Sequence, residues 1–241
     1  MLIATPHETE GAATLAAFCE AHLALKDAKL HDAYFYQSLP LCVIDAVYSV
    51  GVRYEGVQEV VRRYCEYCGL QRFRQPRDRV PPISEQQPLS ALIEKMSERG
   101  FDGFAREIFQ NRQRTSTRGG ILKSEAVFRF STALREHGIN FLQDMPSRVS
   151  DADLEAALRQ IPGQGSRISI SYFFMLAGSE DLIKPDRWIV SFLQRCLGRC
   201  PSLDEAQLLL SEACKALQLK YPHLTPRLLD NAIWKYERVR T

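Results

Sequence analysis

The sequence has no apolar run long enough to cross a bilayer, and residues 1–10 have neither the basic start nor the apolar stretch of a secretion signal. We therefore expect a cytoplasmic protein without a membrane partner. Because no export signal is evident, the seven cysteines are expected to be reduced thiols rather than a disulfide framework. A strong net charge is also missing. The formal charge is +2, so a polyanionic partner would have to be bound by local basic clusters.

Metal-ligand patterns are equally scarce. The five histidines are scattered and form no ligand motif. Cys65 and Cys68 have a spacing that metal sites use, but a zinc site needs four ligands and no second pair accompanies them. Two cysteines that pack in a helical core are the better interpretation, and no metal is expected.

Apolar residues recur mainly at helical spacing. The 241-residue chain is 45% hydrophobic and 25% charged, which suits one large or two small globular domains. Residues three and four positions apart are apolar in the ranges 15–23, 57–64, 89–96, 101–109, 126–134, 154–158 and 206–217. Residues 166–174 alternate like a strand, but no partner strand is evident, so a helix is preferred there as well. The sequence predicts an all-α protein.

Three local features add to this organisation. Residues 73–87 are rich in Pro, Arg and Gln, and we expect a long exposed loop or a crossing between domains. Ser150 and Ser202 precede acidic residues, as helix N-caps do. Asp45 lies in an otherwise apolar helix, where it is either a buried partner of an arginine or a polar pocket residue.

A Pro-Gly-X-Gly stretch at residues 162–165 separates two predicted helices. Its glycines let the backbone turn tightly and approach another surface. The next helix is expected to start at about Ser166, so its free N–H groups would form an anion site that fits a DNA phosphate. Arg167 would add a charged donor to the same phosphate. The alternative is an ordinary turn between helices, because so short a motif is weak evidence alone.

An apolar helix and a short polar loop lead from this turn to Lys184, Pro185 and Asp186. The order and spacing of these elements, over residues 161–192, resemble the helix-hairpin-helix, Gly/Pro-rich loop and aspartate signature of the HhH-GPD superfamily of DNA glycosylases. Endonuclease III, the adenine-mispair glycosylase and the alkylbase glycosylases belong to that superfamily, and the run from Pro185 looks closest to the alkylbase branch. Fainter similarity covers most of residues 39–236.

The resemblance implies a DNA N-glycosylase of the base excision repair type, which flips a damaged or modified base out of double-stranded DNA and hydrolyses its N-glycosidic bond. Asp186 matches the catalytic aspartate, which stabilises a cation-like sugar in the transition state. The residues expected to hold DNA are Gly163, Gln164, Gly165, Ser166, Arg167, Arg118, Lys123 and Arg53, with Arg114 beside them. The residues expected to form the base pocket or the wedge are Ser49, Tyr54, Ile121, Leu122, Tyr172 and Trp188.

The chain also departs from the family pattern. Arg167 stands where bifunctional members carry a Schiff-base lysine, and because an arginine stays protonated, a lyase step is doubtful and a monofunctional hydrolase is favoured. Gln164 replaces the apolar residue that normally anchors the hairpin turn. Cys196 and Cys200 lack the two further cysteines of an iron–sulfur cluster. We expect no cofactor, apart from a monovalent cation that the hairpin carbonyls can hold.

The implied fold has two all-α lobes with a DNA-binding cleft between them. Residues 1–38 and 180–241 would form one lobe, and residues 39–179 would form the other, with the helix-hairpin-helix at about 151–178. The protein is expected to be a monomer, associated with the nucleoid if its source is prokaryotic. Two alternatives remain: a non-catalytic helix-hairpin-helix protein that binds duplex DNA, which Gln164 favours, and a helical scaffold without a DNA role.

Overall fold

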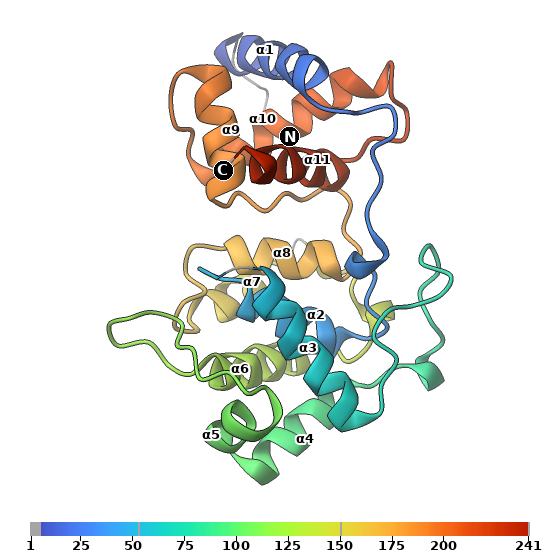
Figure 1. Cartoon of the computed structure of the whole chain (residues 1–241), viewed down its shortest axis with the longest axis vertical. Coiled ribbons are helices and arrows are strands. Elements are labelled where there is room, and N and C mark those ends of the chain that lie inside the picture. Colours follow the sequence, from blue (N-terminus) through green and yellow to red (C-terminus); the bar gives the residue numbers. More distant parts are fainter. Residues whose placement is uncertain (1–5, 53, 150, 241) are drawn as a thin grey trace. The chain divides into compact units, whose positions relative to one another are not determined.

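A computed structural model describes residues 6–52, 54–149 and 151–240, and these residues fold into helices joined by loops (Figure 1). Two isolated bridges pair Tyr36 with Phe73 and Arg114 with Leu122, but no strand forms in the described ranges. The prediction of an all-α protein is confirmed. None of the helices in these ranges combines the length and the apolar character that a membrane crossing needs.

The chain divides into two compact units. One unit joins the described residues up to His31 to those from Glu180 onward, and the other spans Asp32–Ser179. The loop predicted at 73–87 therefore lies inside the second unit and does not cross between units. Its short 3₁₀ turn, Ile83–Glu85, is its only helical element in the described residues.

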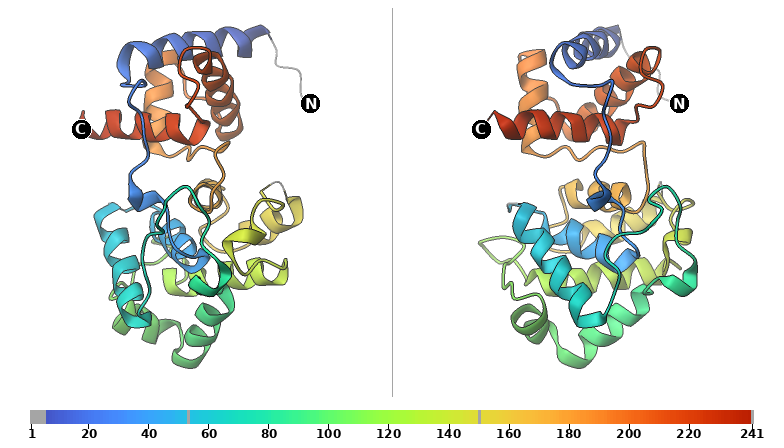
Figure 2. Two further views of the ribbon diagram at one scale, coloured as in Figure 1. Left: turned by 90° about the vertical axis from the view of Figure 1, so that its right-hand side faces the viewer. Right: turned by 45° about the vertical axis from the view of Figure 1, so that its right-hand side comes forward.

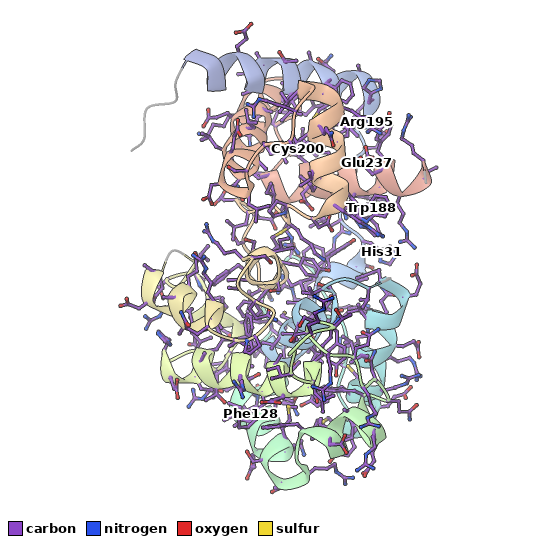
Figure 3. All side chains as sticks on the ribbon, turned by 90° about the vertical axis from the view of Figure 1, so that its left-hand side faces the viewer. His31, Phe128, Trp188, Arg195, Cys200 and Glu237 are labelled. Atoms are coloured by element: carbon purple, nitrogen blue, oxygen red, sulfur yellow. The ribbon has the colours of Figure 1, made fainter. Side chains whose placement is uncertain are left out.

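The first unit packs four helices around one apolar core (Figures 1 and 2). These helices are α1 (Pro6–His22), α9 (Arg187–Leu197), α10 (Leu203–Gln218) and α11 (Pro226–Val239). The ring of Phe192 lies edge-on to Phe18, with centroids 5.2 Å apart, and edge-on to Tyr236 at 5.9 Å. Arg195 of α9 forms an ion pair with the buried carboxylate of Glu237 on α11 (Figure 3). These contacts hold α1, α9 and α11 together.

The second unit surrounds one buried helix. Its α-helices are α2 (Leu39–Tyr48), α3 (Tyr54–Cys68), α4 (Leu89–Arg99), α5 (Phe101–Gly103), α6 (Lys123–Glu136), α7 (Ala152–Arg159) and α8 (Ile168–Leu176), and α5 runs into a π-helical turn, Phe104–Ile108. Every residue of α2 is buried, and α2 packs against α3, α6 and α8 (Figure 1). A helix that is apolar on all sides apart from one residue, Asp45, is expected at such a central position.

Several local expectations can be checked against these helices. The ambiguous segment at 166–174 is helical, but α8 begins at Ile168 rather than at about Ser166. Ser202 caps α10 by accepting a hydrogen bond from the N–H of Glu205 (3.2 Å), as predicted. Ser150 lies outside the described residues, and Asp151 caps α7 instead. The seven cysteines are free thiols, as expected.

Candidate functional site

The turn between α7 and α8 offers several main-chain donors. Gly163 has a φ of +91°, and the N–H of Gln164 closes the turn by donating to the carbonyl of Ile161 (2.9 Å). Gly163, Gly165 and Ser166 are exposed, and their N–H groups donate to no other group among the described residues. Successive N–H groups in a turn of this kind form a concave site for an anionic oxygen.

Gln164 has a different role from the one predicted. Its side chain is 1% exposed, and its Oε1 accepts a short hydrogen bond from the hydroxyl of Ser169 on α8. The Gln164 side chain is therefore inside the protein and cannot contact DNA. It anchors the turn through a buried polar pair, where an apolar residue would anchor it by packing. Ser169 is thus the hydrogen-bond partner that allows glutamine to be buried at position 164, and the sequence alone did not identify it.

Arg167 also differs from its expected role. It precedes α8 in the left-handed conformation, at φ +67° and ψ −12°. Its Nε lies 2.8 Å from Oε1 of Glu155, and one terminal nitrogen donates to Oε2 of the same carboxylate at 3.0 Å. This bidentate ion pair ties α7 to the start of α8. Because Glu155 compensates the guanidinium charge, the anion site of the turn depends on main-chain amides more than on Arg167.

The arginine-rich loop before α6 packs on this turn. The N–H of Thr115 donates to the carbonyl of Ile121 (2.9 Å), and Arg114 donates to the carbonyl of Gly120 (2.6 Å), so the loop folds back on itself. The Thr115 side chain lies so close to Gly163 that a Cβ on that glycine would be 2.5 Å from the Cβ of Thr115. The exposed Arg118 is at the tip of this loop. Two turns distant in sequence therefore form one surface.

Lys123 is buried and does not reach that surface. It is 2% exposed, and its Nζ donates to the carbonyls of Tyr48 (2.9 Å) and Val50 (2.8 Å) at the end of α2. Burial lowers the pKa of Lys123 to about 8. The prediction that Lys123 holds a phosphate is wrong, because both short bonds of its ammonium go to protein carbonyls in the core.

Several predicted pocket residues gather around Asp45. Asp45 is 0% exposed and accepts a hydrogen bond from the hydroxyl of Tyr36 (2.7 Å). Burial raises the pKa of Tyr36, Tyr54 and Tyr172, and the nearby charge of Asp45 raises each of them further. Ser49 follows α2 one turn later, and its N–H donates to the carbonyl of Asp45 (2.8 Å). Asp45 is thus a polar residue among tyrosines.

Asp186 is the first polar group of α9. Its Oδ1 accepts a hydrogen bond from the N–H of Trp188 (2.9 Å), so Asp186 is the N-cap of the helix. The side chain is half-buried, and the Arg187 guanidinium lies 4.5 Å from the centre of the Trp188 ring. The cap occupies one carboxylate oxygen, and Oδ2 has no hydrogen bond within the described part of the chain.

A second carboxylate lies close to Asp186. Asp230 of α11 is 7% exposed, and its Oδ1 accepts a hydrogen bond from the N–H of Lys184 (2.9 Å). Burial raises the pKa of Asp230 to about 8; the charge of Asp186 raises it as well, and the Lys184 bond opposes the shift. At neutral pH Asp230 therefore keeps its proton, mainly because its carboxyl group is buried.

The structure brings the predicted residues together in part. The hairpin residues, Arg118, Ile121 and Leu122 share the second unit with the Asp45 cluster, and Asp186 and Trp188 belong to the first unit. Arg53 lies outside the described residues. Sequence reasoning missed Asp230. The sequence did contain a signal for it. Asp230 lies three residues before the buried Ile233, and this spacing places the acid on the apolar face of the helix.

Within the described residues, no group of three or more His, Cys, Asp or Glu side chains is arranged to hold a metal ion. A family model described as a domain of unknown function, DUF8548, matches residues 13–238. No curated protein and no solved structure matches the chain.

Proposed function

Because the chain belongs to the DUF8548 family, whose description assigns no activity, we propose from its own residues that it is a monofunctional DNA N-glycosylase. In this proposal the turn at residues 163–166 binds a phosphate of double-stranded DNA, and Asp186 acts on the deoxyribose of a flipped nucleotide. The damaged or modified base leaves, and water takes its place on the sugar.

The hairpin turn carries the DNA-binding part of the proposal. It presents the N–H groups of Gly163, Gly165 and Ser166 without internal acceptors, and exposed arginines lie on the loop that packs against it. Phosphate oxygens are acceptors only, so a row of unused donors suits them. Gln164 need not weaken DNA binding by the turn, although it replaces an apolar residue. Its buried side chain stabilises the turn through the hydrogen bond with Ser169.

Asp186 performs the chemical step in this proposal. When the C1′–N bond breaks, its electron pair leaves with the base and positive charge develops on the sugar. The carboxylate of Asp186 stabilises that charge through Oδ2, since Oδ1 is held by the helix cap. Water adds to C1′ and gives one proton to the carboxylate. The carboxylate passes this proton, directly or through solvent, to the departing base, so that one water is consumed and Asp186 is regenerated as a carboxylate. No amine is involved, which fits an arginine at position 167.

Asp230 supports this assignment by remaining neutral. Burial disfavours the charged form of the Asp230 carboxyl group, and the charge of Asp186 disfavours it further. Asp230 is the more buried acid of the pair. Its bond to the N–H of Lys184 also fixes the segment that leads into Asp186. The proposal therefore gives Asp230 a positioning role and Asp186 the contact with substrate.

Asp186→Asn is the test of the chemistry. Asparagine also caps helices well, so the fold is expected to persist while the charge is lost. With duplexes that carry single alkylated, deaminated or oxidised bases, we expect the natural protein to release at least one base class. Release is measured as strand cleavage that requires alkali. Asp186→Asn should lower this rate by about 100-fold or more and leave duplex affinity unchanged.

Asp181→Asn is the matched control, because Asp181 is an exposed acid in the same loop. Its activity should remain close to that of the natural protein. Full activity in Asp186→Asn would refute the assignment. Strand cleavage without alkali, or a covalent adduct trapped by borohydride, would contradict a monofunctional enzyme.

A non-catalytic duplex-binding protein is the second candidate. The N-cap of α9 favours this second candidate, because helix capping alone explains an aspartate at position 186 without any catalytic role. This candidate predicts salt-dependent duplex binding with no base release from any duplex of the panel.

A further inference from the structure

A cavity of about 300 Å³ lies within the second unit, at the end of α2, the start of α3 and the loop after Phe109. None of its lining residues belongs to the proposed phosphate site or to the proposed catalytic group. Val52, Gly56 and Val57 form its apolar side. Its volume is at the lower end of the range for small-molecule sites, about 300–1,000 Å³.

The polar side of the cavity consists of hydrogen-bond donors. Asn111 and Gln113 both line it. The Oδ1 of Asn111 accepts from the N–H of Gln113 (2.9 Å), and the Oε1 of Gln113 lies 3.5 Å from the ammonium of Lys123. Neither side-chain amino group donates to another described residue. Because protein donors take the oxygens, the two amino groups remain for a ligand.

Tyr48 adds a third donor. It lines the cavity and is 1% exposed, and its hydroxyl has no hydrogen-bond partner among the described residues. Burial raises the pKa of Tyr48, so the hydroxyl keeps its proton at neutral pH. A buried hydroxyl without a partner is unfavourable in the folded protein. The hydroxyl oxygen has almost no accessible surface, so a ligand acceptor would reach it, and remove this penalty, only after a local shift of the cavity wall.

We propose that this cavity binds a nucleobase by its acceptor edge, with the donors of Asn111, Gln113 and Tyr48 directed to the carbonyl oxygens of the base and, in cytosine, also to its N3. Val52 and Val57 would contact the faces of the ring. The choice of a nucleobase rests on the proposed function, whereas the donor set is independent of it. Uracil and cytosine carry a carbonyl group and adenine does not, so deoxyuridine and deoxycytidine should bind more tightly than deoxyadenosine.

The experiment uses the full chain and free deoxynucleosides. Binding is followed by NMR through the side-chain amide signals of Asn111 and Gln113. We expect deoxyuridine and deoxycytidine to shift these signals saturably, with deoxyadenosine at least 5-fold weaker. Gly56→Leu, which fills the cavity, should reduce affinity at least 10-fold. Gly56→Ala is its control, because a Cβ there meets no atom within 4 Å. Both substitutions favour the helix, so both variants should fold.

Two isosteric changes test the donors. Tyr48→Phe removes the hydroxyl and should weaken binding by about 2- to 10-fold while raising Tm, because the buried donor disappears. A purely structural tyrosine would give the higher Tm without the weaker binding. Gln113→Glu exchanges the amino donor for an acceptor and should reduce affinity at least 10-fold.

Saturable binding that is unchanged by Gly56→Leu, or no binding of any deoxynucleoside, would overturn the proposal. Free nucleosides require no base release, and Asp186→Asn should therefore bind them normally. If base release fails in every duplex while nucleoside binding persists, only the glycosylase proposal falls.

Discussion

Gly163→Ala is expected to destabilise the protein through two separate effects. The backbone at Gly163 has a φ of +91°, a conformation that costs an L-residue about 1–2 kcal/mol. The new Cβ would also lie 2.5 Å from the Cβ of Thr115 and 3.1 Å from its Cγ2. Overpacking of this kind costs about 1–3 kcal/mol. The sum predicts a loss of about 2–5 kcal/mol in the free energy of unfolding.

A second substitution separates the two effects. Thr115→Gly removes the Cβ that the new alanine would meet, so the double variant should regain the overpacking part but not the backbone part. Thr115→Ala keeps that Cβ and should give little rescue. The coupling energy between Gly163→Ala and Thr115→Gly is therefore expected to be at least about 1 kcal/mol, as contacting residues show.

Urea unfolding of the natural protein, both single variants and the double variant measures this cycle. Additive free energies, within about 0.5 kcal/mol, would refute the packing of the loop on the hairpin turn. The same proteins should be compared for duplex binding. Gly163→Ala distorts the turn that presents the main-chain donors, so weaker duplex binding is expected, with a partial recovery in the double variant.

Two further predictions concern buried charges. Burial lowers the pKa of Lys123 to about 8, so the unfolded chain binds more protons than the folded one between pH 8 and 10.5. The unfolding free energy of the natural protein, relative to Lys123→Met, should rise by roughly 3 kcal/mol across that window, and a flat difference would contradict the burial of the charge. The pKa of Asp230 is raised to about 8, so its contribution is present near pH 4 and is lost as the pH rises towards 8. Asp230→Asn should flatten this decline in urea unfolding, and an unchanged pH profile would exclude a proton on Asp230.

The helices were predictable because their packing is encoded locally. Apolar residues three and four positions apart identify the buried faces of α3, α4, α6 and α10 without knowledge of their partners. Residues 166–174 were ambiguous for a physical reason: α8 is buried on most of its surface, and its apolar residues therefore show little helical periodicity. The absence of a partner strand decided that assignment correctly.

The roles of buried polar residues could not be predicted, because their partners are distant in sequence. Lys123 binds carbonyls at the end of α2, more than seventy positions earlier. Asp230 accepts a hydrogen bond from the N–H of Lys184, and helices α9 and α10 lie between these two residues in the sequence. A sequence places lysine and glutamine on the surface by default, since an unpaired buried charge or amide is unfavourable. That default gave the wrong role to Lys123 and to the side chain of Gln164.

Asp230 and Lys123 impose opposite pH dependences on different parts of the chain. Raising the pH towards 8 removes the proton of Asp230 and weakens the unit that contains Asp186. Above pH 8 the loss of charge on Lys123 strengthens the unit that contains the hairpin. At neutral pH the ammonium of Lys123 remains charged, and the carbonyls at the end of α2 compensate it, because a helix C-terminus favours a cation. Only the unit that contains Asp186 is therefore expected to lose stability as the pH rises towards 8.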